Sequence, residues 1–184
     1  MILNTVLRAA QQEGAETELF SVVGKNIQAC DGCGGCRKTG ECHIQDDMQG
    51  LYVKMLEANG IIFGVPSYYY GMAGQAKDII DRTNCLGRPG RSLANKVGSV
   101  VAVGGSLGLA DILKDIYFYM VTRQMIPANF VAAYGLEKGD AAKLENGLKA
   151  AAEVGQQMVK IARLNFKYPS EIKGSMFGYG TWNK

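Results

Sequence analysis

Two periods of hydrophobic and polar positions alternate along the chain, and they predict buried strands and amphipathic helices in turn. Continuous apolar runs, typical of strands buried in a parallel sheet, cover 60–66, 96–105 and 129–135. Residues 16–23 alternate apolar and polar positions and predict one more strand. Helical patterns cover 4–13, 46–58, 74–86, 109–125 and 140–164.

The alternation of strands with helices predicts an open α/β fold, with a parallel sheet and helices on both of its faces. In such sheets ligands bind beyond the carboxyl ends of the strands. Three unusual loops follow predicted strands, namely the cysteine-rich segment 29–44, the segment PSYYYG at 66–71 and the segment GGS at 104–106. We therefore expect the three loops to lie at one edge of the sheet.

Composition narrows the class of protein. The 184 residues suit one domain, or one domain plus an arm, and a hydrophobic share of 47% is enough to bury a core. The net charge of +3 is too small to indicate a nucleic-acid partner. No apolar run approaches the roughly 20 residues of a membrane span, and no basic segment followed by a long apolar one begins the chain. We expect a cytoplasmic protein that binds neither membranes nor nucleic acids.

The cysteine loop carries the strongest chemical signal. Its spacing is Cys30-x2-Cys33-x2-Cys36-x5-Cys42, and such compact runs of four thiolates bind 4Fe-4S clusters. The glycines within it tolerate positive φ and so allow a tight wrap: Gly32, Gly34 and Gly35. Structural zinc, a disulfide pair and an empty or oxidised loop are the alternatives.

The fifth cysteine and the polar residues of the loop have simpler interpretations. Cys85 is expected to be a small buried residue. His43, the one histidine, either shields the cluster edge or is an ordinary polar loop residue. Arg37 and Lys38 either guide an acidic electron donor or are simply solvated.

The two other loops suit a flat aromatic ligand. Pro66 ends a strand, three tyrosines follow at 68–70, and Gly71 allows close backbone approach. Gly104 and Gly105 leave the next strand end without side chains, so that a planar ring could lie against it. The alternative is that the tyrosines fill a helix–sheet or subunit contact. No nucleotide-binding GxGxxG, P-loop lysine or hydrolytic triad is present.

The cysteine motif, the stretch VPSYYYGMAGQAKDIIDR and the strand ending in VGG together resemble the iron–sulfur flavoproteins. These belong to the flavodoxin-like group that includes NADPH-dependent FMN reductases and multimeric flavodoxins. The resemblance implies a flavodoxin-like three-layer sandwich over 1–164, with the inserted cysteine loop at about 29–44. It leaves 165–184 as an aromatic and glycine-rich arm.

The resemblance also implies a site. Cys30, Cys33, Cys36 and Cys42 would hold a 4Fe-4S cluster. The residues expected to wall the flavin ring of FMN are Pro66, Ser67, Tyr68, Tyr69, Tyr70 and Gly71. Gly104, Gly105 and Ser106 would contact its other side or edge.

The implied activity is electron transfer from a ferredoxin-like donor through the cluster to FMN, and on to a small-molecule acceptor. A flavin-dependent NAD(P)H or quinone reductase without a functional cluster is one alternative, and a metal-stapled non-catalytic subunit is another. The resemblance further implies a homo-oligomer, a dimer or a tetramer, in which the cluster and the flavin of neighbouring subunits lie close together. The arm would lie on a neighbour through its aromatic residues: Phe166, Tyr168, Phe177, Tyr179 and Trp182.

One departure from the family concerns the start of the chain. The family opens with a strand and a phosphate-binding loop ending in Gly-Asn-Thr, whereas here only Asn4 and Thr5 match the end of that loop. We expect the sheet to lack its first strand and most of the phosphate loop. Either the chain is incomplete at its N-terminus, or it folds with four strands that a neighbour completes.

Overall fold

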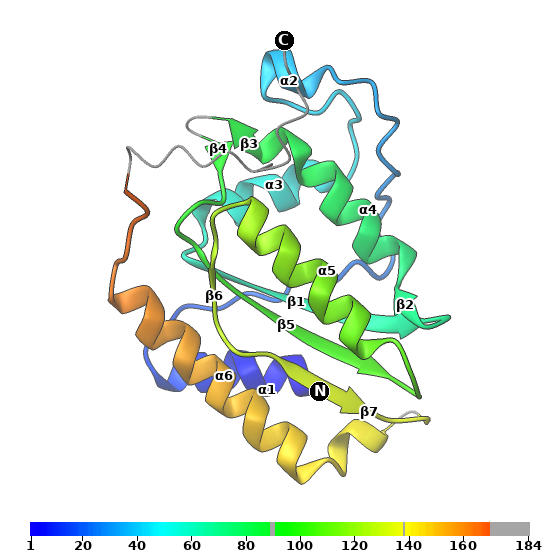
Figure 1. Ribbon diagram of the computed structural model, residues 1–184, viewed down its shortest axis with the longest axis vertical. Coiled ribbons are helices and arrows are strands. Elements are labelled where there is room, and N and C mark those ends of the chain that lie inside the picture. The colour runs from blue at the N-terminus through cyan, green and yellow to red at the C-terminus, as the bar shows by residue number, and fades with distance from the viewer. Residues whose placement is uncertain (89–90, 138, 170–184) are drawn as a thin grey trace.

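A five-stranded sheet lies between two layers of helices in the computed structural model, which describes residues 1–88, 91–137 and 139–169 (Figure 1). In chain order the elements are α1 (Ile2–Gln12), α2 (Cys36–Thr39), α3 (Met48–Glu57), β1 (Gly60–Tyr68), β2 (Gly71–Met72), α4 (Gly74–Arg82), the 3-10 helix η1 (Thr83–Leu86), β3 (Gly87–Arg88), β4 (Arg91–Ser92), β5 (Val97–Gly104), α5 (Leu109–Thr122), β6 (Ile126–Pro127), β7 (Val131–Tyr134), the 3-10 helix η2 (Asp140–Ala142) and α6 (Glu145–Arg163).

The sheet is built around β5, which is buried along almost its whole length. β1 pairs with it in parallel, in a register that runs from Gly60 opposite Val97 to Pro66 opposite Val103. β6 and β7 also pair with β5 in parallel, β6 at its start and β7 at its end. β2 turns back on β1 as an antiparallel hairpin, and β3 and β4 form a separate small hairpin.

A hydrophobic cluster lies on each face of the sheet. On one face, α3, α4 and α5 pack with residues such as Tyr52, Ile112 and Met120 at the centre. On the other face, α1 and α6 pack with residues such as Val6 and Val154. These two clusters give the three layers of the sandwich, because each helix buries one apolar stripe against the sheet.

The predicted α/β architecture is confirmed. The patterns at 4–13, 46–58 and 109–125 are each a single helix, namely α1, α3 and α5. The pattern at 74–86 is the helix α4 followed by the 3-10 turn η1. In 140–164 the helix α6 follows a short 3-10 turn. The three continuous apolar runs are β1, β5 and β7. Among the described residues, no helix combines the length and the apolar character needed to cross a membrane.

The strand predicted at 16–23 is wrong. The segment forms no helix or strand, and its apolar positions find no core, since Leu19 is 49% exposed and Val23 86% exposed. Alternation alone makes a strand only where a sheet edge and a buried face are available. Among the described residues, the edge of β1 away from β5 pairs only with β2, at Ser67 and Tyr68. That the sheet lacks a first strand stays a prediction.

Candidate functional site

The tyrosine loop is the tight hairpin that joins β1 to β2. Tyr68 pairs with Gly71, so Tyr69 and Tyr70 are the two turn residues, and both have positive φ, of 50° and 67°. A two-residue hairpin requires positive φ at both turn positions, and Asn and Gly normally supply it. Bulky residues held in this region store strain, which concentrates at ligand sites. The side chains stay accessible, Tyr69 being 98% exposed.

The loop that follows β5 closes against the tyrosine loop. The Ser67 hydroxyl donates a hydrogen bond to the Leu107 carbonyl at 3.2 Å. A Cβ atom on Gly104 would lie 2.8 Å from Ser67 Cβ, and one on Gly108 would overlap the Tyr70 backbone. Because side chains are excluded at these two glycines, the two backbones approach closely at the carboxyl ends of β1 and β5.

The remaining glycine-loop residues face outward. Gly104 is buried, whereas Gly105 and Ser106 are exposed beside it. The Gly135 amide donates to the Gly104 carbonyl at 3.0 Å, which brings the end of β7 to the same edge. The strand ends therefore form a ledge next to the three tyrosines, bordered by the exposed side chains of Leu107 and Leu136.

Asn4 and Thr5 lie in the first turn of α1, apart from these loops. Leu3 beside them packs on Gly64, where a Cβ atom would meet the Leu3 side chain at 3.0 Å. Asn4 is exposed and borders an open hollow of about 640 Å³ together with Arg8 and Thr17. No contact between either residue and the tyrosine loop is found in the described part of the chain, so their assignment to FMN rests on the resemblance.

The cysteine loop presents its four thiols along one irregular segment around the short helix α2. Cys30 and Cys33 are exposed, while Cys36 and Cys42 are half-buried against the hydrophobic cluster of α3, α4 and α5. Positive φ occurs at Gly32, Gly34 and Gly40, the last being the left-handed cap of α2. Four unoxidised thiols on a tightly turning loop fit a cluster chemically, because thiolates are the usual ligands of iron–sulfur centres.

Asp31 and His43 contact each other across this loop. His43 Nε2 lies 2.7 Å from Asp31 Oδ2, and both side chains are about half exposed. The Cys33 amide donates to Asp31 Oδ1, and this bond, with the one from His43, holds the pKa of Asp31 below its usual value. Donor atoms of Asp31, Cys33 and His43 lie within 4.8 Å of one another. This is a donor set that Zn²⁺ also accepts.

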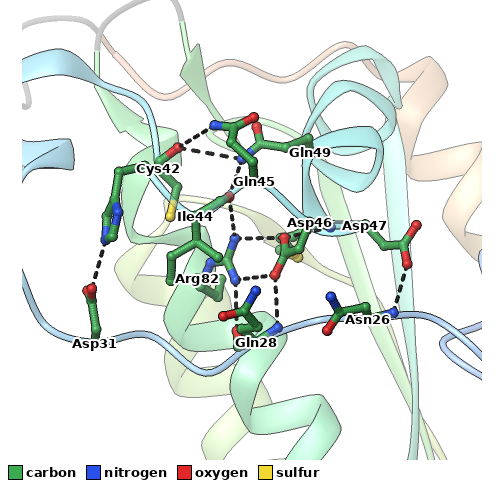
Figure 2. A network of polar contacts seen from close by, with 12 residues as sticks. Asn26, Gln28, Asp31, Cys42, Ile44, Gln45, Asp46, Asp47, Gln49 and Arg82 are labelled. Atoms are coloured by element: carbon green, nitrogen blue, oxygen red, sulfur yellow. Dashed lines mark hydrogen bonds and ion pairs between the residues drawn. The ribbon is translucent and has the colours of Figure 1, made fainter.

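A buried ion pair anchors the loop, and sequence analysis missed it (Figure 2). Arg82, at the end of α4, pairs with Asp46 at 2.7 Å and 2.9 Å, and neither side chain is accessible to solvent. Burial disfavours the charge of Asp46, but hydrogen bonds from Arg82 and from the Gln28 and Met48 amides outweigh burial and lower its pKa. The pair raises the pKa of Arg82 in the same way, against its burial.

A second contact joins the end of α4 to a cysteine. Asn84 Nδ2 lies 3.6 Å from Cys36 Sγ, within hydrogen-bonding distance of a sulfur acceptor. Cys85, next to it, is 1% exposed, as expected of a small buried residue.

The expectation that all three loops share one sheet edge is wrong. The tyrosine loop and the glycine loop meet at the carboxyl ends of β1 and β5, but the cysteine loop lies at the other end of α4 (Figure 1). It does not follow a strand, because 16–23 is irregular, so the rule for strand-end loops does not apply to it. α4 begins beside the tyrosine loop and ends beside Cys36.

The described part of the arm lies on its own chain. Phe166 and Tyr168 pack edge to face, and the Tyr168 amide donates to Asn95 Oδ1 at 2.8 Å. Phe177, Tyr179 and Trp182 lie outside the described residues.

Residues 1–136 match the family described as NADPH-dependent FMN reductase. An iron–sulfur flavoprotein of Methanocaldococcus jannaschii is 34% identical over an alignment of 174 residues, which covers 89% of this chain and 90% of that protein. An iron–sulfur flavoprotein of Methanosarcina thermophila is 30% identical over 166 residues, 89% of this chain and 87% of that protein.

Solved structures similar to this chain share its fold. A WrbA-like flavodoxin from Agrobacterium tumefaciens has a TM-score of 0.58 at 18% identity, covering 89% of this chain and 91% of the other. A flavodoxin from the domain Archaea has a TM-score of 0.57 at 11% identity, covering 88% of each chain. At such identities the likeness shows the fold alone, and that fold is the flavodoxin-like one predicted.

Proposed function

The chain belongs to the flavodoxin-like NADPH-dependent FMN reductase family, as an iron–sulfur flavoprotein, and we propose that this FMN-dependent oxidoreductase receives single electrons through a 4Fe-4S cluster. The donor is a small ferredoxin-like protein, and the acceptor is a small molecule reduced by the flavin. When bound, FMN accepts electrons singly and delivers them in pairs. Two single-electron deliveries by the donor would therefore balance one two-electron reduction of the acceptor.

The observation that carries the proposal is the combination of two sites on one chain. Four thiols turn around α2 at one end of α4, and the strained tyrosine hairpin closes on the glycine loop at the other end. Cys30, Cys33, Cys36 and Cys42 would hold the cluster.

At the flavin site the chain's own groups would bind and orient the ring. Gly104 and Gly105 carry no side chains of their own, and Tyr68 and Tyr70 are more than half exposed beside them. We assign the rest of the wall to Pro66, Ser67, Tyr69, Gly71 and Ser106, and the phosphate to Asn4 and Thr5 at the start of α1, where the helix dipole favours an anion.

The proposal includes a homo-oligomer. Within one chain the two sites lie at opposite ends of α4, whose nine residues span about 13 Å. A neighbouring chain that places its cysteine loop on the exposed tyrosines would shorten the path. The four loop cysteines, all without disulfides, suit the reducing cytoplasm, where we place the protein.

The test is the visible spectrum and composition of anaerobically purified protein. We expect flavin absorption with a broad iron–sulfur shoulder, about four irons per chain, and bleaching by reduced ferredoxin. Fewer than about one iron per chain after anaerobic reconstitution would rule out the cluster. Rapid reduction of the flavin by NADPH in Cys33→Ser and Cys36→Ser variants would instead favour a reductase without a cluster.

A second candidate follows from the Asp31, Cys33 and His43 donors. These three would allow the loop to hold Zn²⁺ as a staple in a non-catalytic subunit. Metal analysis separates the two: zinc without FMN supports the staple, and iron with FMN supports electron transfer.

A further inference from the structure

The ion pair between Arg82 and Asp46 closes the cysteine loop at both of its ends. Arg82 Nη1 donates to the Gln28 carbonyl at 2.7 Å, before the first cysteine, and Nη2 donates to the Ile44 carbonyl at 3.2 Å, after the last. Asp46 Oδ2 accepts from the Gln28 amide at 2.8 Å. The guanidinium of Arg82 and the carboxylate of Asp46 thus join the segment that enters the loop to the segment that leaves it, as Figure 2 shows.

The rest of the guanidinium is held just as firmly. Arg82 Nε lies 3.3 Å from the Tyr52 hydroxyl, which in turn donates to the Arg82 carbonyl at 3.0 Å. Tyr52 is 1% exposed and comes from α3, on the far side of the loop. Arg82 therefore fixes the loop relative to both α3 and α4, and every polar group in this buried network has a partner.

Two cysteines depend on this anchor more than the others. Cys36 and Cys42 pack against the cluster of α3, α4 and α5, and Cys36 also accepts from Asn84, two residues after Arg82. Cys30 and Cys33 are exposed and lie further out on the loop. Release of the anchor should free the inner pair, whereas the outer pair is accessible already.

We propose that Arg82 is a positioning residue that holds the cysteine loop in its folded shape before a metal binds. The purpose of that shape, which is metal binding, rests on the proposed function, whereas the shape itself does not depend on it. A preformed loop binds a cluster without the entropy cost of ordering sixteen or so residues at that moment. A buried salt bridge is by itself weak evidence that the pair stabilises the fold. The contacts of this one converge on the two ends of the loop, which favours a role in holding the loop.

The experiment measures the loop in metal-free protein. Cysteine alkylation followed site by site by mass spectrometry reports the accessibility of Cys36 and Cys42, and hydrogen exchange of the β5 amides reports global opening. In Arg82→Lys, which keeps the charge but not the fork of donors, we expect at least about a tenfold faster alkylation of the inner pair. Alkylation of Cys30 and Cys33 should change by less than about twofold, and β5 exchange should accelerate by a smaller factor than alkylation of the inner pair.

Lys77→Met is the matched control. It removes a basic side chain from the same helix, where Lys77 forms an exposed pair with Asp81. Alkylation of the inner pair in this control should match the wild type. Arg82→Met serves as a second variant, which removes the charge as well, and should release the inner pair further.

Three results would overturn the proposal. The first is unchanged alkylation of Cys36 and Cys42 in both Arg82 variants. The second is acceleration that β5 exchange matches, since Arg82 would then support the whole fold. The third is failure of both variants to fold, which carries the same meaning. Iron loading is measured separately: a wild type that binds no iron would refute the cluster, while a released inner pair would still establish the anchor.

Discussion

Gly108 offers a direct test of the contact between the tyrosine loop and the glycine loop. Its φ is +94°, and a Cβ atom there would overlap the carbonyl group and Cα of Tyr70. In Gly108→Ala, the left-handed backbone costs about 1–2 kcal/mol. The overlap involves main-chain atoms that no rotamer change can move, and such overpacking costs about 1–3 kcal/mol. Together these estimates predict a loss of about 2–5 kcal/mol.

Two assays measure the effects of this loss of stability. For a chain of this size each kcal/mol lowers the melting temperature by about 2–4 °C, so the variant should melt at least about 4 °C below the wild type. Part of the strain can be relieved by displacing the tyrosine hairpin, which would disturb the ledge. Titration of metal-free, flavin-free protein with FMN should therefore show weaker binding as well.

Gly50→Ala is the matched control for the same chemical change. Gly50 lies within α3, and a Cβ atom there would meet nothing within 4 Å. Removing a glycine from a helix interior should stabilise the protein by about 0.5–1 kcal/mol. If Gly108→Ala kept both the melting temperature and the FMN affinity of the wild type, the close approach of the two loops, and the site built on it, would be refuted.

Three further changes test the packing and the charges by urea unfolding. Gly155→Ala gains about 1 kcal/mol of helix propensity, but its Cβ atom would overlap the Val6 carbonyl oxygen, a main-chain atom that no rotamer change can move. Net destabilisation is therefore expected, and a stabilised variant would contradict the packing of α1 on α6. Asp46→Asn should cost about 3–5 kcal/mol at pH 7 by leaving Arg82 unpaired. Because the folded pKa of Asp46 is lowered, its contribution is present above about pH 4 and is lost as pH falls through that lower pKa; a gap to wild type that failed to narrow in acid would contradict this. Lys54→Met removes an exposed ion pair and should change stability by less than about 1 kcal/mol; a larger loss would contradict that.

The local hydrophobic pattern was sufficient to predict helices that bury a full apolar stripe and strands that are buried on both faces. β5 reads as a continuous apolar run because helices cover both of its faces, and α1 repeats its buried positions at Ile2, Val6 and Ala9. The segment 16–23 has the alternation of a strand, but a strand also needs a partner edge, and that is a property of the whole sheet. The sequence alone could not reveal that this segment pairs with no edge of the sheet.

Part of the candidate site could likewise be predicted from the sequence, and part could not. Cysteine spacing and the run of tyrosines are visible locally, and both were identified. The anchor of the cysteine loop was missed because its two charged residues stand 36 positions apart, and each looks ordinary where it stands. One signal was available: Arg82 follows Ile79 by three positions and so falls on the apolar stripe of α4, where a charge must find a buried partner.

The placement of α4 decides how the two sites can communicate. The helix starts where the Ala73 amide donates to the Pro66 carbonyl, beneath the tyrosine hairpin, and it ends at Arg82, which closes the cysteine loop. A helix fixed at both ends acts as a rigid spacer, so the two sites of one chain cannot approach each other by a loop movement. The proposed electron transfer would therefore either cross the length of α4 or use the sites of two chains. The exposed tyrosines and the exposed outer cysteines, Cys30 and Cys33, are the groups that a second chain could bring together. The helix that separates the sites thus supports the proposal of a homo-oligomer.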